Sequence, residues 1–121
     1  MTETENAYRP EPLQVVTTTT DGITVVTVAG EIDHNTAGPL IEALEVSNVG
    51  ERPRVVVDMQ QVAFMDSSGI NVLLTAHRAL TAADGWLRLA GVQASVLRTL
   101  DIVGVDQIIA CYPTIGDALT T

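Results

Sequence analysis

The chain has 121 residues, enough for one domain with a real hydrophobic core. Hydrophobic residues make up 46% of it and aromatic residues only 3%, so the core is expected to consist of Val, Leu, Ile and Ala. The formal net charge of -9 argues against nucleic acid or an anionic membrane surface as the main partner, because phosphate groups bind to basic surfaces.

All six basic residues are arginines. The absence of lysine excludes Schiff-base chemistry and a phosphate-binding P-loop. It also argues against a phosphoaspartate receiver domain with Asp58 as its acceptor, because such a domain needs a lysine beside the acid. Cys111 is the single cysteine, which excludes an internal disulfide and fits a reducing compartment. The N-terminus is acidic and polar, unlike a signal peptide, and no apolar stretch reaches membrane-spanning length. A soluble, cytoplasmic protein with no membrane partner is therefore expected.

The first part of the chain predicts a polar leader followed by a β-hairpin. Residues 1–12 contain three glutamates and two prolines and are expected to be a disordered, solubilising leader. Two runs rich in Val and Thr follow, at residues 13–20 and 23–29, and Asp21-Gly22 separates them. An Asp-Gly pair between two β-prone runs predicts antiparallel strands joined by a tight turn.

A turn and a helix are predicted next. Asn35 or Thr36 is expected to cap the helix, and residues 48–50 to end it. Pro39 is tolerated because it falls in the first turn. The expected apolar face consists of Ala37, Leu40, Ile41 and Leu44. Asp33 is either a turn former that binds its own backbone or a functional polar group at the edge of the sheet, and the local pattern leaves both interpretations open.

The centre of the chain is a predicted buried strand that leads into a helix. The strand begins at residues 54–58 and is expected to be interrupted or irregular at Gln60-Gln61. Asp66 and Ser67 are typical helix-start residues, so a helix is expected from about residue 68 to residue 82 or 83. Ser67 is thus expected to be exposed in the positive field of a helix N-terminus, either as a plain cap or as a phosphate carrier. His77 is interpreted as a packed, hydrogen-bonded residue of this helix.

The last third of the chain continues the alternation of strands and helices. A strand is predicted at residues 86–90 and another at residues 108–111. The helix between them is expected to begin at Gln93 or Ser95 and to end at Gly104, with Val96, Leu97 and Leu100 facing inward. A capping box that begins at Thr114 predicts a final helix. The order β-β-α-β-α-β-α-β-α predicts an α/β fold: a mixed, largely parallel sheet flanked by helices, with three strand-end loops gathered at one edge.

No enzyme class has a usable set of residues. The serines Ser67 and Ser68 lack the glycine two positions earlier that a nucleophile elbow requires, and His34 would be a base without an orienting group. The nine glycines never occur as Gly-x-Gly, and two histidines and one cysteine give no metal-binding spacing. The chain is therefore expected not to be an enzyme and to bind neither metal nor cofactor. A binding surface with a modifiable serine remains as the interpretation.

The motifs Gly30-Glu31-Ile32-Asp33 and Asp66-Ser67-Ser68-Gly69-Ile70, the second after a β-branched strand, resemble those of the STAS domain of bacterial anti-sigma factor antagonists. The similarity continues through residues 87–91, 97–104 and 112–119, so it covers residues 12 to 119. It implies a STAS domain at residues 13–119, with a mixed sheet of about five strands and about four helices.

The resemblance also implies partner switching. In that family the unphosphorylated antagonist binds an anti-sigma factor, usually an ATP-dependent serine kinase, and so releases a sigma factor. The kinase phosphorylates the serine after the Asp, which is Ser67 here, and a PP2C-type phosphatase restores the binding form. ATP belongs to the kinase, so no cofactor is implied for this chain. The implied partner-binding residues are Asp33, Asn35, Thr36, Asp66 and Ser68. The alternative is a non-catalytic STAS module that binds a small ligand or serves as a scaffold subunit of a larger signalling complex.

Overall fold

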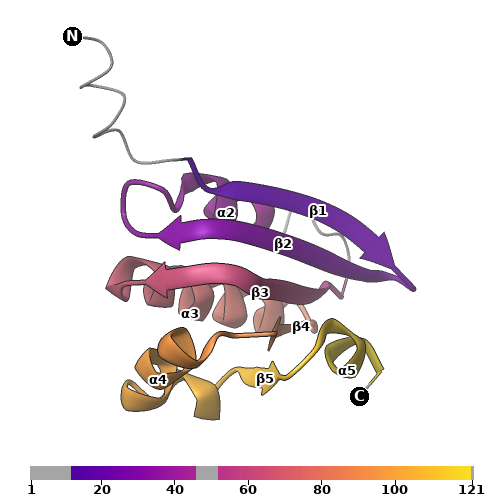
Figure 1. Cartoon of the computed structure of the whole chain (residues 1–121). Helices are drawn as coiled ribbons and strands as arrows, with labels where there is room; N and C mark the ends of the chain where they lie inside the picture. The colour runs from indigo at the N-terminus through magenta and orange to yellow at the C-terminus, as the bar shows by residue number, and fades with distance from the viewer. Residues whose placement is uncertain (1–11, 46–51, 121) are drawn as a thin grey trace, which may run out of the picture.

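The computed structural model describes residues 12–45 and 52–120 (Figure 1). Strands and helices alternate after an opening pair of strands, in the predicted order, with one additional 3-10 helix, η2. The elements are β1 Gln14–Thr20, β2 Ile23–Ile32, α2 Gly38–Ala43, β3 Arg54–Met65, α3 Ser67–Ala82, β4 Trp86–Ala90, α4 Ala94–Ile102, η2 Val105–Gln107, β5 Ala110–Tyr112 and α5 Ile115–Thr120.

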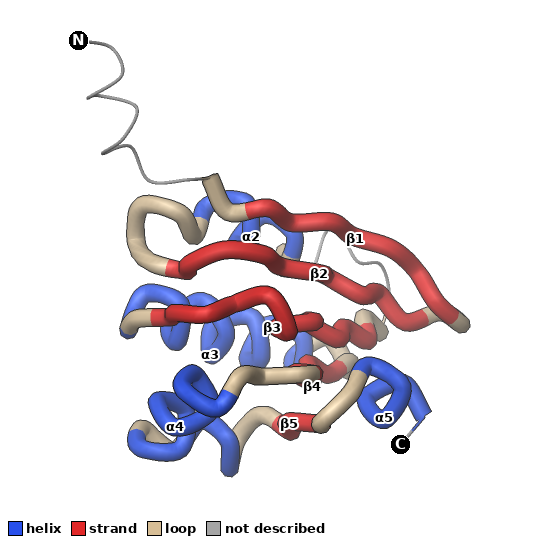
Figure 2. The backbone as a smooth tube through the Cα atoms, in the orientation of Figure 1, coloured by secondary structure: helices blue, strands red, loops and turns tan. Residues whose placement is uncertain are grey.

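The five strands form one sheet in the order β1-β2-β3-β4-β5 (Figure 2). β1 and β2 are antiparallel, whereas β2, β3, β4 and β5 run parallel to their neighbours. The Asp21-Gly22 turn has φ angles of 52° and 79°, the left-handed pair that a two-residue hairpin turn requires. The predicted hairpin and the predicted mixed sheet are both confirmed.

The central strand β3 supplies side chains to two apolar clusters on opposite faces of the sheet. Val55 and Val57 join the larger cluster, to which α2, α3 and α4 contribute Leu40, Leu73 and Leu100. Val56, between them in sequence, joins a smaller cluster with Ala118 of α5. This alternation follows from the period of two along a strand. Figure 1 accordingly shows α2 and α3 behind the sheet and α5 in front of it.

β2 is longer than predicted and continues to Ile32. β3 carries on irregularly through Gln60-Gln61 to Met65, which is one of the two predicted alternatives. Its pairing with β2 shifts register between Thr27 and Ala29, opposite Asp58 and Gln61, and again between Gly30 and Glu31. Bulges of this kind re-aim the ends of strands, and here they bring Ile32 of β2 opposite Met65 of β3.

Two apolar residues predicted to face inward are exposed instead. Ile41 is 48% exposed and Leu97 38%. Each follows a buried residue directly, because the core stripes of α2 and α4 are narrow and use residues four apart, Leu40 with Leu44 and Val96 with Leu100.

Other differences concern the ends of elements. The cap of α2 is Ala37, not Asn35 or Thr36, and the helix ends at Ala43. The predicted helix end at residues 48–50 and the predicted leader up to residue 11 lie outside the described residues. β5 begins at Ala110 because the amides of residues 108 and 109 instead donate to the carbonyl oxygen of Val105. His77 is half-buried as predicted, but its Nδ1 has no hydrogen-bond partner among the described residues.

None of the helices in the described part of the chain combines the length and the apolar character needed to cross a membrane.

The start of α3 is packed so closely against the sheet that a side chain at residue 69 would displace its neighbours. A Cβ atom at Gly69 would collide with Met65 Cγ and would lie 2.8 Å from Met65 Sδ and 2.9 Å from Ile32 Cγ2. These distances are shorter than carbon and sulfur atoms tolerate without displacement. The glycine therefore lets the first turn of α3 approach the ends of β2 and β3.

Substituting Gly69→Ala is expected to lower the free energy of unfolding by about 1–3 kcal/mol, the usual range for overpacking. Gly38→Ala is the matched control, because no atom lies within 4 Å of a Cβ placed there, and it should be neutral or slightly stabilising. Urea denaturation of both variants measures the difference. Equal stability of the two would contradict the close approach of α3.

Candidate functional site

The carboxyl ends of the parallel strands β2 and β3 bring two loops together at one edge of the sheet. Ile32 and Met65 are paired at the last position of their strands, and the Asp66 amide donates to the Ile32 carbonyl oxygen at 3.1 Å. Asp33 directly follows β2 and Asp66 directly follows β3. Because neighbouring strands lie about 4.8 Å apart, the two aspartates are close together. The third predicted loop lies further back along β3, because β4 ends at Ala90 opposite Asp58, and Gln93 Nε2 donates to the Gln60 carbonyl oxygen at 2.8 Å. Only two of the three predicted loops therefore meet at this edge.

At the start of α3 it is Asp66, not Ser67, that caps the helix. One carboxylate oxygen of Asp66 accepts a hydrogen bond from the Ser68 amide at 2.8 Å, and the Asp66 carbonyl oxygen accepts from the Ile70 amide at 3.2 Å. Ser67 is the first residue of the helix, is exposed, and its hydroxyl makes no hydrogen bond to the described residues. The sequence left open whether Ser67 is a cap, and the structure assigns that role to its neighbour.

The position of Ser67 is suited to an anion. It lies at the N-terminus of a helix of 16 residues, where unpaired amides and the helix dipole carry partial positive charge. Ser68 is half-buried and its amide is already bonded to Asp66, so its side chain is less accessible than that of Ser67. Of the two adjacent serines, Ser67 is the one that a second protein can reach more easily.

The loop after β2 is held by its own side chains. Asp33 Oδ1 accepts from the amides of Asn35 at 2.8 Å and Thr36 at 3.1 Å, which is the arrangement of an Asx turn. Thr36 Oγ1 accepts from the Asp33 amide at 2.9 Å and donates to the Glu31 carbonyl oxygen at 2.7 Å. Thr36 is 7% exposed and thus supports the loop from inside, whereas Asn35 and His34 face outward.

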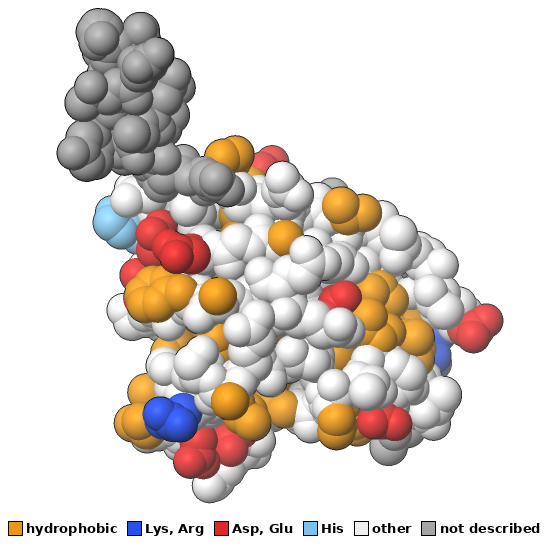
Figure 3. All heavy atoms as spheres, in the orientation of Figure 1, with side chains coloured by type: hydrophobic (Ala, Val, Ile, Leu, Met, Phe, Trp, Pro, Cys, Tyr) orange, Lys and Arg blue, Asp and Glu red, His pale blue; other side chains and the backbone are white. Residues whose placement is uncertain are grey.

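The edge also contains two residues that were not among the predicted partner-binding residues. Glu31 and Phe64 lie opposite one another in β2 and β3, both are exposed, and Phe64 is 48% exposed despite its size. A polar cleft of about 410 Å³ opens beside Glu31 and Asp33. Figure 3 shows carboxylates, apolar atoms and a histidine close together at this end of the molecule. Phe64 was missed because the bulge beside Glu31 shifts the alternation of inward and outward side chains.

The described ranges gather no set of metal ligands, and the cysteine Cys111 is partly buried. Within residues 12–45 and 52–120 no three His, Cys, Asp or Glu side chains could hold a metal ion together. Burial, and to a smaller extent the nearby Asp106 carboxylate, raises the pKa of the Cys111 thiol. The thiol therefore stays protonated near neutral pH, which makes it a poor nucleophile.

Several known proteins share this sequence pattern and this fold. The anti-sigma-B factor antagonist of Listeria monocytogenes is 39% identical over 82 residues, which cover 68% of this chain and 72% of the relative. The crystal structure of an anti-sigma factor antagonist from Mycobacterium paratuberculosis superposes with a TM-score of 0.81 at 31% identity, covering 93% of this chain and 95% of that one. The Bacillus protein SpoIIAA in its phosphorylated form shares the fold, with a TM-score of 0.64 at 22% identity over 88% of this chain and 96% of its own.

The family model described as STAS domain matches residues 14–118, nearly the whole of the described chain. The five-stranded mixed sheet and the four α-helices of the described residues agree with this match. The chain belongs to the STAS domain family, in which its relatives include anti-sigma factor antagonists.

Proposed function

We propose that this protein is an anti-sigma factor antagonist whose unphosphorylated form binds an anti-sigma factor and so releases a sigma factor. Phosphorylation of Ser67 by that anti-sigma factor, a serine kinase, abolishes binding, and a PP2C-type phosphatase restores it. The observation that carries the proposal is the exposed Ser67 hydroxyl, which is free of capping because Asp66 caps α3. The function of the relatives named above supports the same role, which would be exercised in the cytoplasm.

The switch would act through charge. A phosphate adds a charge of about -1.5 to -2, and the N-terminus of α3 stabilises an anion at Ser67. The same phosphate lies beside the carboxylates of Asp33 and Asp66 at an edge that is already negative. A partner surface docked over this edge would meet new bulk, and an acidic patch of the partner at this point would be repelled, while the fold itself would persist. The phosphorylated form of SpoIIAA, which has this fold, supports that persistence.

The proposed partner surface combines both loops. Asp66 and Ser68 flank the acceptor, and Asp33 and Asn35 lie on the neighbouring loop. Thr36 would contribute indirectly, because its buried hydroxyl holds the loop in shape. The rigidity of this loop means that little conformational entropy is lost when a partner binds.

The binding test compares Ser67→Ala with Ser67→Asp against the purified anti-sigma factor kinases encoded in the source genome, each by calorimetry. Ser67→Ala is expected to bind one of them as the unmodified protein does, and Ser67→Asp at least tenfold more weakly because of the added charge. Thr81→Asp is the control, since it places the same charge on the last turn of α3, about 21 Å away. Equal affinity of Ser67→Ala and Ser67→Asp would refute the switch and favour a module for a small ligand or a scaffold.

Measurements of the free energy of unfolding test whether Asp66, and not Ser67, caps α3. Asp66→Ala is expected to lower the free energy of unfolding by about 1 kcal/mol because the Ser68 amide loses its acceptor, and Asp66→Asn by less. Ser67→Ala should change the stability by no more than about 0.5 kcal/mol, as an exposed residue without a structural contact. Chemical denaturation distinguishes the two. A large loss for Ser67→Ala would mean that the serine is a cap after all.

A further inference from the structure

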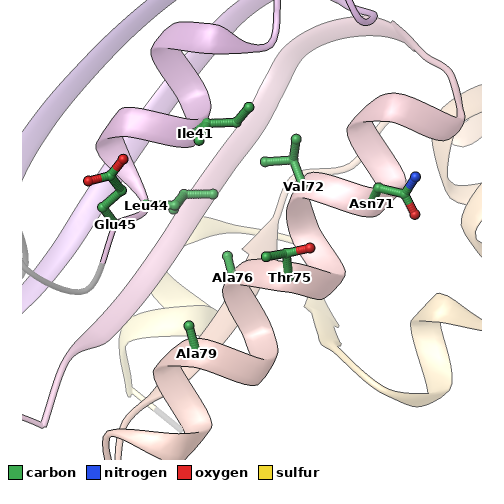
Figure 4. A pocket seen from close by; sticks show the side chains of 8 residues that line it. All are labelled: Ile41, Leu44, Glu45, Asn71, Val72, Thr75, Ala76 and Ala79. Carbon is green, nitrogen blue, oxygen red and sulfur yellow. The ribbon is translucent and has the colours of Figure 1, made fainter.

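A groove between α2 and α3 lies outside the switch site described above. It has a volume of about 490 Å³, and its walls are formed by Ile41 and Leu44 on one side and Val72, Ala76 and Ala79 on the other. Figure 4 shows these side chains pointing toward one another across the gap between the two helices. The alanines give the groove its depth, because no longer side chain of α3 fills it.

The groove is apolar but open, which is unfavourable for a surface that stays in water. Ile41 is 48% exposed, and Val72 is only half-buried. A contiguous apolar hollow of this kind is typical of a binding surface. The helices could have closed it with one larger residue at position 76 or 79, so the small residues leave space for atoms from another molecule.

The groove is continuous with the proposed switch surface. Asn71, on its rim, lies four residues after Ser67 and hence one turn further along the same side of α3. The loops at the edge supply only a handful of exposed residues, whereas a stable protein interface takes about 20–30 residues from each partner. A partner seated on Ser67 must therefore extend over neighbouring surface, and the groove offers apolar area beside it.

We propose that the groove receives a segment of the anti-sigma factor, with apolar side chains inserted between α2 and α3 and a basic residue beside Glu45. This inference rests on the proposed function and names where the same partner docks. Glu45 is the charged group on the rim of the groove, and the chain as a whole carries a net charge of -9, so a basic partner segment is complementary. Asn71 and Thr75 supply polar groups for hydrogen bonds along the α3 rim.

The test fills the groove while the switch is held in its binding state. In the Ser67→Ala background, Thr75→Trp and Ala79→Trp place a bulky side chain in the groove at exposed helix positions. Thr81→Trp is the matched control, because Thr81 is exposed on the same helix but does not line the groove. Affinity for the purified anti-sigma factor kinase that binds Ser67→Ala is expected to fall at least tenfold for the two groove variants and by less than twofold for the control.

A second pair of variants guards against effects of bulk on folding. Ile41→Asp introduces a charge into the groove at an exposed position, and Ile102→Asp introduces it at the end of α4, where the side chain is 77% exposed. Circular dichroism and melting curves establish that all variants are folded. Loss of affinity for Ile41→Asp but not for Ile102→Asp supports the proposal.

The remaining outcomes separate this inference from the function on which it rests. If Ser67→Ala and all groove variants bind with full affinity, the groove is not the docking site of the anti-sigma factor, and the proposed function is unaffected. Absence of binding by Ser67→Ala to every kinase removes both. A concentration-dependent dimer in sedimentation that Thr75→Trp abolishes assigns the groove to a second copy. A rise in melting temperature with decanol, while the groove variants still bind the kinase, assigns the groove to a small apolar ligand. The dimer result and the decanol result would each overturn the proposal.

Discussion

The hydrogen bonds of Asp66 are the constraint on which the rest of the site depends. Its amide donates to the Ile32 carbonyl oxygen, which continues the pairing of β2 and β3 by one residue, and its carboxylate accepts from the Ser68 amide. One residue thus ends the central strand and starts the helix that crosses behind the sheet. Because the Asp66 carboxylate already caps the first turn of α3, the Ser67 side chain is not needed as a cap. The site is therefore a consequence of how the strand-to-helix junction is built.

Much of this arrangement could be predicted from the sequence because it depends on local chemistry. The Asp21-Gly22 pair determines the hairpin, alternation defines Trp86–Ala90, and Asp66 before an apolar helical pattern marks the start of α3. The parallel order of strands then places the loops after β2 and β3 at one edge. These predictions need only neighbours in sequence and the rules of sheet topology.

Most of the predictions that failed depend on contacts between residues that are distant in sequence. The register shifts opposite Gly30 and Glu31 are properties of two paired strands, so neither strand alone indicates that Phe64 turns outward. One failure is local: Asn35 or Thr36 was expected to cap α2, but the Thr36 hydroxyl is bonded to Asp33 and Glu31 within the preceding turn. The exposure of Ile41 depends on where α2 ends and on how small the facing residues of α3 are. The groove could not have been predicted from either helix alone.

In the proposed complex, the edge around Ser67 would control whether the partner binds, and the groove would contribute to how tightly it binds. A phosphate at Ser67 gains about 0.3–1 kcal/mol from the helix N-terminus within this chain. In a docked complex the same charge would lose its water and face the partner, where like charges are unfavourable by several kcal/mol. Every 1.4 kcal/mol of that difference changes the affinity tenfold, so one phosphate is enough for a switch without any movement of the fold.

The apolar groove cannot act as the switch, because its contacts do not depend on the charge of Ser67. Its contribution would be the same in both phosphorylation states, as a source of affinity and of selectivity among related partners. In the proposed complex, affinity and regulation would be separated along α3, with the proposed acceptor at residue 67 and apolar contacts from residue 72 onward. With this separation, the apolar residues can change to suit one partner while the acceptor serine and its capping Asp66 remain unaltered.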